Sequence, residues 1–217
     1  AGCGVTSKVI WALQFSQLPL YNRTVCLLNV RPGNETLVLE ALLLTNLIEV
    51  DRITENIVPG MVGIDQTRLG HFLSGREIFV YDEETQLKLL KRIFGQEAEI
   101  GVTDIAPDIH RVFPSLSGMS LYRMSTTPKI TRYDDGNGTE LDVLKRLFVS
   151  YVVQSEESIS EGFRSCLDLV AIGTLADLMP LQDENRILVN VGIERINANP
   201  RGAIRDLITR TNLSGKR

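Results

Sequence analysis

A stretch in the last third of the sequence places one acidic side chain among hydrophobic ones. Residues 167–181 read Leu-Asp-Leu-Val-Ala-Ile-Gly-Thr-Leu-Ala-Asp-Leu-Met-Pro-Leu, with Asp177 near the end. The pattern predicts a buried helix that is broken at Gly173-Thr174 and closed by Pro180. Because an ionised carboxylate is costly to bury unless it is paired or bound to a metal, Asp177 is a candidate metal ligand. A carboxylate that caps the helix is the alternative, and the spacing alone does not separate the two.

The same stretch resembles the last metal motif of RecJ-type exonucleases of the DHH phosphoesterase superfamily. In that motif a D-L-V-A-x-G-T-x-A-D-x-x-P-L run precedes E-N-R and a helix, and here Asp168–Leu181 precedes Glu184-Asn185-Arg186. Residues 1–13 are similar to the small-residue helix that follows the DHH motif in this family. Residues 199–208 are similar to the segment that leads into the family's long connecting helix. The resemblance covers about residues 1–16 and 158–217.

The resemblance implies a two-metal phosphodiesterase that degrades single-stranded DNA from its 5′ end in DNA repair and recombination. In this family Mn²⁺ or Mg²⁺ ions, held by Asp and His, bind the scissile phosphate and activate a water, and 5′-mononucleotides are released. Asp177 matches the final metal-ligating aspartate, so it is the expected catalytic residue. Four further positions are expected to support this ligand or to face the substrate, namely Asp168, Thr174, Asn185 and Arg186.

Alternatives remain open for these supporting positions. Asp168 lies nine residues before Asp177, about half a helical turn out of phase, so the two should not face the same ion. We expect Asp168 to cap a helix or to support the ligand. Asn185 and Arg186 are expected either to orient neighbouring groups and touch a phosphate, or to make contacts at the start of a helix.

The sequence departs from the family pattern in ways that bear on activity. No Asp-His-His occurs, and the two histidines, His71 and His110, are isolated, as surface or core imidazoles usually are. The family's first acidic motifs and its C-terminal substrate-binding part are also missing from the sequence. Because one aspartate cannot assemble a two-metal centre, we expect this polypeptide alone not to hydrolyse DNA. The alternatives are another DHH phosphodiesterase, acting on oligonucleotides or cyclic dinucleotides, and a non-catalytic interaction module.

The expected fold class is α/β, with mostly helical ends that form part of a DHH-type doubly wound domain around an α/β insertion. Residues 1–20 are assigned to a helix of the DHH domain and 21–155 to the insertion. Residues 156–217 are assigned to the C-terminal part of the DHH domain, with the last metal motif and the start of the connecting helices.

Local patterns predict the individual elements. In the helix over 1–16, close backbone approach would explain Gly2 and Gly4. The predicted strands are 24–30, 47–53 and 78–81, and the predicted helices start at about Glu35 and Asp82 and span 140–154, 163–172 and 183–196, with a last helix opening at Pro200. Residues 96–133 are expected to form loops with a few strands, and 133–139 a turn. The helix over 183–196 is expected to bury Ile187, Leu188, Val191 and Ile193.

The insertion has two possible roles. We favour a structural or partner-binding insert, with a repair protein as a possible partner, over a second catalytic module such as an exonuclease-like domain. A catalytic module would need acidic residues arranged on strands. The available aspartates match no known spacing, and they are Asp51, Asp65, Asp82, Asp104 and Asp108.

The composition, 43% hydrophobic and 23% charged residues, is typical of a soluble protein with a hydrophobic core. The net charge of −4 argues against a large non-specific nucleic-acid surface, but a metal-dependent nuclease needs carboxylates at its centre. No stretch is apolar enough to cross a bilayer and no secretory signal begins the sequence, so we expect a cytoplasmic protein without a membrane partner. Cys3, Cys26 and Cys166 are widely spaced and are expected to be buried thiols.

Overall fold

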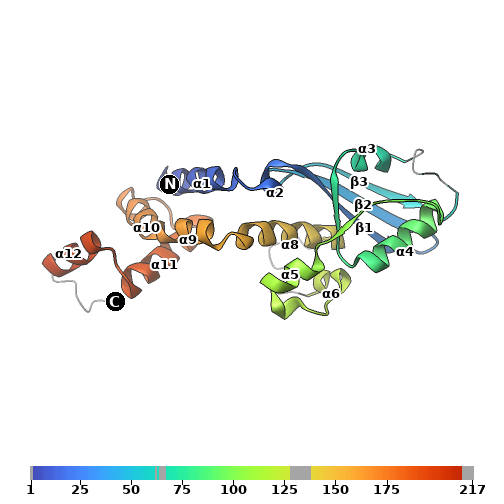
Figure 1. The fold of residues 1–217 in the computed structure, drawn as a ribbon. Coiled ribbons are helices and arrows are strands. Elements are labelled where there is room, and N and C mark those ends of the chain that lie inside the picture. Colours follow the sequence, from blue (N-terminus) through green and yellow to red (C-terminus); the bar gives the residue numbers. More distant parts are fainter. Residues whose placement is uncertain (1, 62, 64–66, 128–137, 212–217) are drawn as a thin grey trace. The chain divides into compact units, whose positions relative to one another are not determined.

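The computed structural model describes residues 2–61, 63, 67–127 and 138–211 (Figure 1). The chain divides into two compact units. Unit 1 consists of residues 1–17 and 156–217, and unit 2 of residues 18–155. Unit 1 is helical in its described residues, and unit 2 contains a five-stranded mixed sheet, so the predicted α/β class is confirmed. Among the described residues, no helix has both the length and the apolar character that a membrane span requires.

The sheet of unit 2 has the strand order β3-β2-β1-β4-β5. The strands β1 (Thr24–Pro32), β2 (Leu37–Thr45) and β3 (Ile48–Ile57) form an antiparallel meander. The short strands β4 (Glu77–Val80) and β5 (Thr103–Asp104) continue the sheet parallel to β1. The carboxyl ends of β1, β4 and β5 therefore lie on the same side of unit 2.

Helices cover both faces of this sheet (Figure 1). On one face, α5 (Ala106–Val112), α6 (Leu121–Ser125) and α8 (Glu140–Ser155) pack on alternate side chains of the strands, with the short 3₁₀ helix η2 (Pro114–Leu116) between α5 and α6. On the other face, α3 (Leu69–Leu73) and α4 (Glu83–Phe94) pack on the remaining side chains. Unit 2 thus buries a hydrophobic cluster on each side of its sheet.

The helix predicted from about Glu35 is wrong, because residues 37–45 form the strand β2. Every residue from Leu37 to Leu44 is buried, since β2 lies between β1 and β3 and is covered on both faces. A continuous apolar run of this length fits a doubly covered strand as well as a buried helix. The strands predicted over 24–30, 47–53 and 78–81 are confirmed.

The unit that follows β4 forms as predicted. Asp82 is the N-cap of α4, and its carboxylate accepts hydrogen bonds from the Thr85 amide and hydroxyl. Gly95 ends the helix with a positive φ. The expectation of loops and a few strands over 96–133 is wrong in part, because α5 and α6 are helices and only β5 is a strand among the described residues there. The turn predicted over 133–139 lies mostly outside the described residues.

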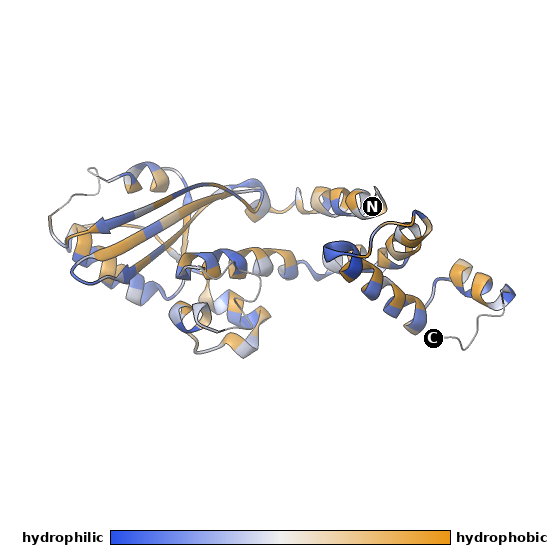
Figure 2. Cartoon of the chain, turned by 180° about the vertical axis from the view of Figure 1, so that it is seen from behind, coloured by the Kyte–Doolittle hydropathy of each residue, from blue (hydrophilic) through white to orange (hydrophobic). Residues whose placement is uncertain are grey.

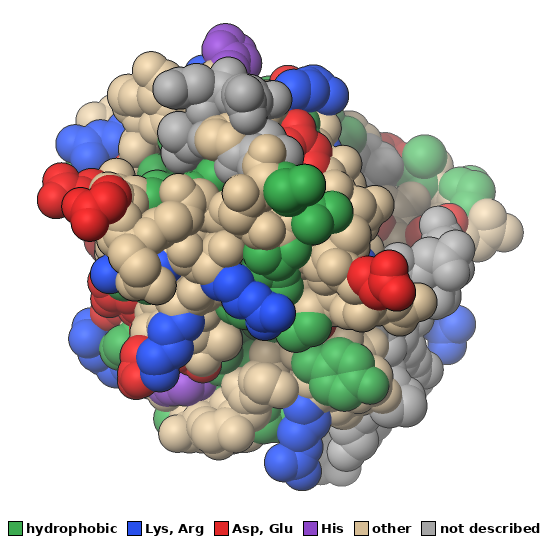
Figure 3. Space-filling view, turned by 90° about the vertical axis from the view of Figure 1, so that its right-hand side faces the viewer, with side chains coloured by type: hydrophobic (Ala, Val, Ile, Leu, Met, Phe, Trp, Pro, Cys, Tyr) green, Lys and Arg blue, Asp and Glu red, His purple; other side chains and the backbone are tan. Residues whose placement is uncertain are grey.

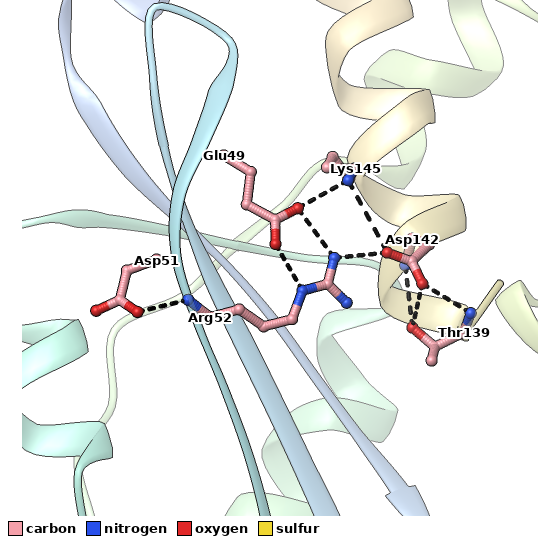
Figure 4. Close-up of polar contacts among 6 residues, drawn as sticks. All are labelled: Glu49, Asp51, Arg52, Thr139, Asp142 and Lys145. Atoms are coloured by element: carbon pink, nitrogen blue, oxygen red, sulfur yellow. Dashed lines mark hydrogen bonds and ion pairs between the residues drawn. The ribbon is translucent and has the colours of Figure 1, made fainter. Parts of the chain in front are cut away.

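The helix α8, predicted over 140–154, begins with a reciprocal cap. The Thr139 hydroxyl accepts a hydrogen bond from the Asp142 amide, and the Asp142 carboxylate accepts from the Thr139 amide at 2.9 Å. Figure 4 shows how Asp142 also joins α8 to β3: it pairs with Arg52 at 2.5 Å, and Arg52 and Lys145 share Glu49. From this start α8 runs back along the sheet, so its last residues lie at the same end of unit 2 as α2 (Pro19–Asn22) (Figure 1).

Unit 1 contains α1 (Gly2–Phe15), α9 (Glu157–Ser165), α10 (Leu167–Ala176), α11 (Asp183–Ala198) and α12 (Gly202–Arg210). α10 packs against α1, α9 and α11. Two glycines let these helices approach closely, and at the first of them the helix break predicted at Gly173-Thr174 does not occur. α10 continues through Gly173, where a Cβ atom would lie 2.5 Å from Cys3 Sγ of α1. At Gly192 of α11, a Cβ atom would overlap the Leu167 carbonyl oxygen of α10.

Three further predictions are wrong in whole or in part, namely those for the glycines of α1, for the cysteines and for the buried face of α11. Gly4 is buried as expected, but nothing lies within 4 Å of a Cβ at Gly2, so close packing does not explain that residue. Cys26 is buried, whereas Cys3 is exposed and Cys166 is half-buried. The predicted buried face of α11 is wrong, because the helix buries Val189 and Gly192 and exposes three of the four predicted residues, namely Ile187, Val191 and Ile193.

Unit 1 leaves many hydrophobic side chains exposed. Figure 2 shows hydrophobic residues along α1, α10 and α11. On α1, for example, Leu13 is 63% exposed, and on α11 Ile187 is 60% exposed. The other exposed hydrophobic residues on these three helices are Val5, Val9, Ile10, Leu169, Ile172, Leu175, Val191 and Ile193.

Candidate functional site at the end of helix α10

The turn that follows α10 holds Asp177 at the C-cap position of the helix. The Met179 amide donates to the Thr174 carbonyl at 3.2 Å, and the Leu178 amide donates to the Leu175 carbonyl at 3.1 Å. This pair of bonds is the Schellman arrangement, in which the residue after the cap adopts a left-handed conformation. Here that residue is Leu178, with a φ of 50°. The position of Asp177 is therefore fixed by backbone hydrogen bonds on both sides of it.

Two features of this turn are locally unfavourable. A left-handed conformation costs a residue with a Cβ atom roughly 1–2 kcal/mol, and Leu178 gains little packing in return because it is 90% exposed. Asp177 places an anion at the C-terminal end of α10, where the helix dipole is already negative. Locally unfavourable backbone and charge often mark functional sites, and a bound cation at Asp177 would offset the electrostatic cost.

The sequence predicts that the Asp177 carboxylate is buried, and this prediction is wrong because Asp177 is exposed. Its side chain has no ion pair or hydrogen bond with any other described residue, so no internal cation neutralises it. The carboxylate is therefore available to an external ligand, but the cost of burial is not the reason.

The buried carboxylate of this stretch is Asp168, which is only 1% exposed. Asp168 Oδ2 accepts a hydrogen bond from Arg201 Nε at 2.6 Å, and Oδ1 accepts from the Leu169 amide at 2.8 Å. The Arg201 guanidinium also donates to the Ser165 carbonyl oxygen. The bond to Asp168 raises the pKa of Arg201 further above its ordinary value. This pair joins the first turn of α10 to the segment before α12.

Arg201 was not identified from the sequence, although it is the ion-pair partner of the buried Asp168. A buried carboxylate requires a partner, and the partner lies 33 residues further along the chain. The usable signal was chemical: Arg201 follows Pro200 directly before a predicted helix, where a long basic side chain can reach back to a neighbouring helix.

Thr174 is buried within unit 1. It is 1% exposed, and its carbonyl oxygen takes part in the turn that ends α10. Its place in the structure is in the packing of unit 1, next to Gly173, whose missing side chain lets α1 approach α10. Thr174 thus contributes to the position of Asp177 through the backbone.

Asn185 and Arg186 lie in the first turn of α11. Asn185 Nδ2 donates to the Pro180 carbonyl at 3.1 Å, which ties the start of α11 to the turn after Asp177. Arg186 is exposed, so its guanidinium can reach solvent or an anionic ligand. In the same turn, Glu184 forms an ion pair with Lys8 of α1.

The resemblance implies metal ions, and the described residues contribute one carboxylate toward them. No group of three His, Cys, Asp or Glu side chains in the described part of the chain is placed to hold a metal ion. Asp177 alone does not make the two-metal centre that the family uses. The donors among the described residues therefore do not fit the complete two-metal group.

The acidic residues of unit 2 do not form a recognisable catalytic set either. Asp82 caps α4, and the Asp104 carboxylate accepts hydrogen bonds from the amides of Asp82, Glu83 and Ala106. Asp51 bonds to the Arg52 amide on β3, and Asp108 pairs with Arg111 within α5. Asp65 lies outside the described residues.

The two histidines are also in unit 2. His110 Nε2 lies 2.7 Å from the Tyr81 hydroxyl, which in turn donates to the Met119 carbonyl. Because that hydroxyl has one proton, it cannot donate to His110 Nε2 and to the Met119 carbonyl at the same time. His71 is exposed in the last turn of α3.

Comparison with known proteins links part of the chain to one kind of nuclease. The single-stranded-DNA-specific exonuclease RecJ of Bacillus subtilis (strain 168) is 52% identical over 42 residues, which are 19% of this chain and 5% of that protein. The RecJ protein of Dickeya dadantii (strain 3937) is 51% identical over 60 residues, 27% of this chain and 10% of that protein. Part of this sequence is therefore similar to RecJ, and the matched segment spans a tenth or less of each relative's length. No protein-family model and no solved structure matches the chain.

Proposed function

We propose that this chain is a segment of a single-stranded-DNA-specific exonuclease of the RecJ type. In this proposal unit 1 belongs to the catalytic DHH-type domain, unit 2 is an insertion in it, and Asp177 is one ligand of the metal centre. The observation that carries the proposal is the exposed Asp177 carboxylate at the end of α10, which pairs with no other described residue and lies in the stretch that resembles the family's last metal motif. The two RecJ relatives support it.

The exposed hydrophobic side chains of unit 1 provide independent support. Soluble proteins seldom leave contiguous apolar surface of several helices in water, and such surface usually contacts other protein. The exposed residues of α1, α10 and α11 are therefore expected to pack against further parts of a catalytic domain. If the protein were an interaction module built around unit 2 alone, exposed hydrophobic residues on α1, α10 and α11 would not be expected.

The proposed reaction is hydrolysis of single-stranded DNA from the 5′ end, with release of 5′-mononucleotides, in repair and recombination. Mn²⁺ or Mg²⁺, when bound, would supply Lewis-acid stabilisation and an activated water. The residues of this chain hold the metal-binding carboxylate in position. Asp177 offers its carboxylate to the metal, the backbone of the turn fixes that carboxylate, and Asn185 holds the turn against α11. Arg186 is placed to contact a phosphate.

The same proposal predicts that the isolated chain is inactive, because the described residues supply a single carboxylate. Purified chain incubated with Mn²⁺ and 5′-labelled single-stranded DNA should release no more mononucleotide than a buffer control. Robust, metal-dependent release by the chain alone would contradict the proposal that the remaining ligands lie elsewhere.

A chimera tests the assignment of Asp177. In the RecJ protein of Bacillus subtilis, the segment that corresponds to residues 158–217 of this chain is exchanged for those residues, and exonuclease activity on single-stranded DNA is measured with Mn²⁺. We expect the chimera to be active and Asp177→Asn to lower its activity by at least about a hundredfold, as removal of a group that acts only in catalysis commonly does. The matched control is Asp206→Asn, an exposed aspartate on α12. If the chimera is active and both variants retain that activity, Asp177 is not a catalytic ligand.

A further inference from the structure

Unit 2 contains a cavity of about 840 Å³ that the nuclease proposal does not use. Its wall is formed by the carboxyl ends of β1, β4 and β5 and by the first residues of α4, α5, α6 and α8. Open α/β sheets form ligand crevices at this place, where connections leave the carboxyl ends of parallel strands in opposite directions. The volume lies in the range of small-molecule and side-chain pockets.

At the floor of the cavity, a side chain forms the hydrogen bonds that the backbone of β1 would otherwise lack. β1 extends beyond the end of β4, which would leave the Val30 amide and carbonyl without a sheet partner. The Gln86 side chain of α4 replaces that partner: its Oε1 accepts from the Val30 amide at 2.7 Å, and its Nε2 donates to the Val30 carbonyl at 3.2 Å. The crevice is therefore kept open by a specific side chain, and the sheet does not need a further strand there.

The charge of the wall is predominantly negative. Three carboxylates line it, those of Asp82, Asp104 and Glu140. Among the described residues of the wall, Arg31 is the one Lys or Arg, and it is already paired with the buried Glu40 at 3.3 Å. Burial raises the pKa of the Glu140 carboxyl, while Asn29 and Arg31 act in the opposite direction. A phosphate in this cavity would meet like charge, and a cation would meet opposite charge.

A buried amide adds a donor to this wall. Asn29 is 1% exposed, and its Oδ1 accepts a hydrogen bond from Gln86 Nε2. Its Nδ2 has no partner of normal hydrogen-bond geometry in the described part of the chain, although it lies close enough to Glu140 to lower that pKa. A buried amide donor in this state is satisfied best by a ligand that brings a carbonyl oxygen.

Hydrophobic side chains complete the wall, among them Leu89, Pro107, Met119 and Leu121. Figure 3 views unit 2 from the side on which β1 ends, and charged side chains of both signs surround hydrophobic ones near the centre of that view. The cavity thus combines hydrophobic side chains, an amide hydrogen-bond donor and three carboxylates.

We propose that this cavity is a peptide-binding site, which takes a basic side chain, Lys or Arg, flanked by an apolar residue of a partner protein. The basic group pairs with Glu140 and Asp104, a peptide carbonyl accepts from Asn29, and the apolar neighbour packs on Leu89 and Met119. A nucleic-acid strand is disfavoured because its phosphates would approach three carboxylates. The site is independent of the proposed exonuclease activity, since it lies wholly within unit 2.

Binding of matched peptides to the full 217-residue chain tests the proposal. The probes are a capped Leu-Arg-Leu tripeptide, the same peptide with Glu in place of Arg, and a short oligothymidylate, each titrated into ¹⁵N-labelled chain and followed by NMR. We expect saturable shifts of the amides around Asn29, Glu140 and Met119 with the arginine peptide. The glutamate peptide should bind at least about tenfold more weakly, a difference of one ion pair. Binding of the arginine peptide should weaken as salt rises.

A pair of variants locates the site. Glu140→Gln should weaken binding of the arginine peptide about tenfold, whereas Glu97→Gln, an exposed residue outside the cavity, should leave binding unchanged. The amide spectrum of each variant shows whether the variant is folded. If Glu140→Gln does not fold, the salt dependence of peptide binding to the unaltered chain tests the ion pair instead. Equal binding of both peptides, no saturable binding of the arginine peptide, a salt-independent affinity, or shifts at these amides with oligothymidylate alone would each overturn the proposal.

Discussion

The two units of this chain differ in how far they bury their hydrophobic residues. Unit 2 places a helix layer on each face of its sheet and buries most of its large hydrophobic side chains. Unit 1 buries few of them, and α1, α10 and α11 expose many more. The difference teaches that unit 2 has the core of an independent domain, while unit 1 has the surface of a part that packs against something else.

The chain contains its own reporters for this comparison. Its one tryptophan, Trp11, lies in unit 1, where it stacks on Phe163 at a ring distance of 4.9 Å. All five tyrosines lie between residues 18 and 155, in unit 2. Tryptophan fluorescence therefore reports unfolding of unit 1, and tyrosine absorbance reports unfolding of unit 2.

The largest expected effect is a cavity in the core of unit 2. Phe148 of α8 is fully buried and contacts Phe79 at a ring distance of 5.0 Å. Phe148→Ala should lower the free energy of unfolding by about 3–5 kcal/mol. Urea denaturation followed by tyrosine absorbance measures it. The matched change in unit 1, Leu13→Ala on α1, should cost less than about 0.5 kcal/mol by tryptophan fluorescence because Leu13 is exposed. A similar loss of unfolding free energy in the two variants would contradict the difference in burial between the units.

A smaller effect is expected from the ion pair that unit 1 does bury. Arg201→Ala leaves the carboxylate of Asp168 buried without its partner, and we expect a loss of about 1–3 kcal/mol. The value is below that of a fully buried pair because the Arg201 side chain is partly exposed. The control is Arg205→Ala, whose side chain bonds only to the Pro200 carbonyl on the surface. Tryptophan fluorescence should show a lower urea midpoint for the first variant alone, and equal midpoints would argue against a structural role for the pair.

The network between β3 and α8 should make unit 2 sensitive to acid. The hydrogen bond from Arg52 lowers the pKa of Glu49 from its ordinary value of 4.5 to about 2. A lowered folded pKa means that the stabilisation is complete above pH 4.5 and is lost as the pH falls toward 2. We expect a loss on the order of 1 kcal/mol over this window, less than the full shift because solvent screens the network.

Glu49→Gln serves as the comparison for this pH effect. The variant should be less stable than the parent chain at pH 6 and should lose less stability between pH 5 and pH 2.5, as measured by tyrosine absorbance in urea. Parallel pH profiles for the two proteins would show that Glu49 is not coupled to folding.

The smallest expected effect is a gain of stability at the candidate site. Leu178→Gly removes a Cβ atom from the left-handed position after α10, and we expect it to stabilise unit 1 by about 0.5–1 kcal/mol. Leu181→Gly, two residues beyond the turn and without a positive φ, should give no gain. Tryptophan fluorescence in urea measures both. If Leu178→Gly destabilises unit 1, the exposed leucine has a packing role and the strain argument for the site is wrong.

Much of unit 2 could be predicted where local signals decide the structure. The strand over 78–81, the Asp82 cap and the Gly95 end follow from residues that act within one turn of one another. The strand β2 could not be predicted in this way, because its leucines also suit a helix and only the pairing with β1 and β3 decides. The helices α5 and α6 are short and depend on packing against α8.

The candidate site shows a similar limit. Asp177 and Asn185 were identified from the sequence, and the structure places both at the turn that ends α10. Their chemical roles stay predictions. Which carboxylate is buried was predicted wrongly, since this depends on the side chain of Arg201 from a distant segment. The buried face of α11 was predicted from the positions of its hydrophobic residues, but the absence of a side chain at Gly192 decides it.

The course of α8 has a consequence for how such a chain could arise. Because α8 returns along the sheet, the polypeptide enters and leaves unit 2 at the same end (Figure 1). A domain with this geometry can be gained or lost by a host protein in a single genetic event, since a short peptide can replace it without stretching the host's backbone. Homologous proteins that differ by the presence of unit 2 are therefore an expected outcome of evolution, and excision of unit 2 is a practical route to a smaller protein.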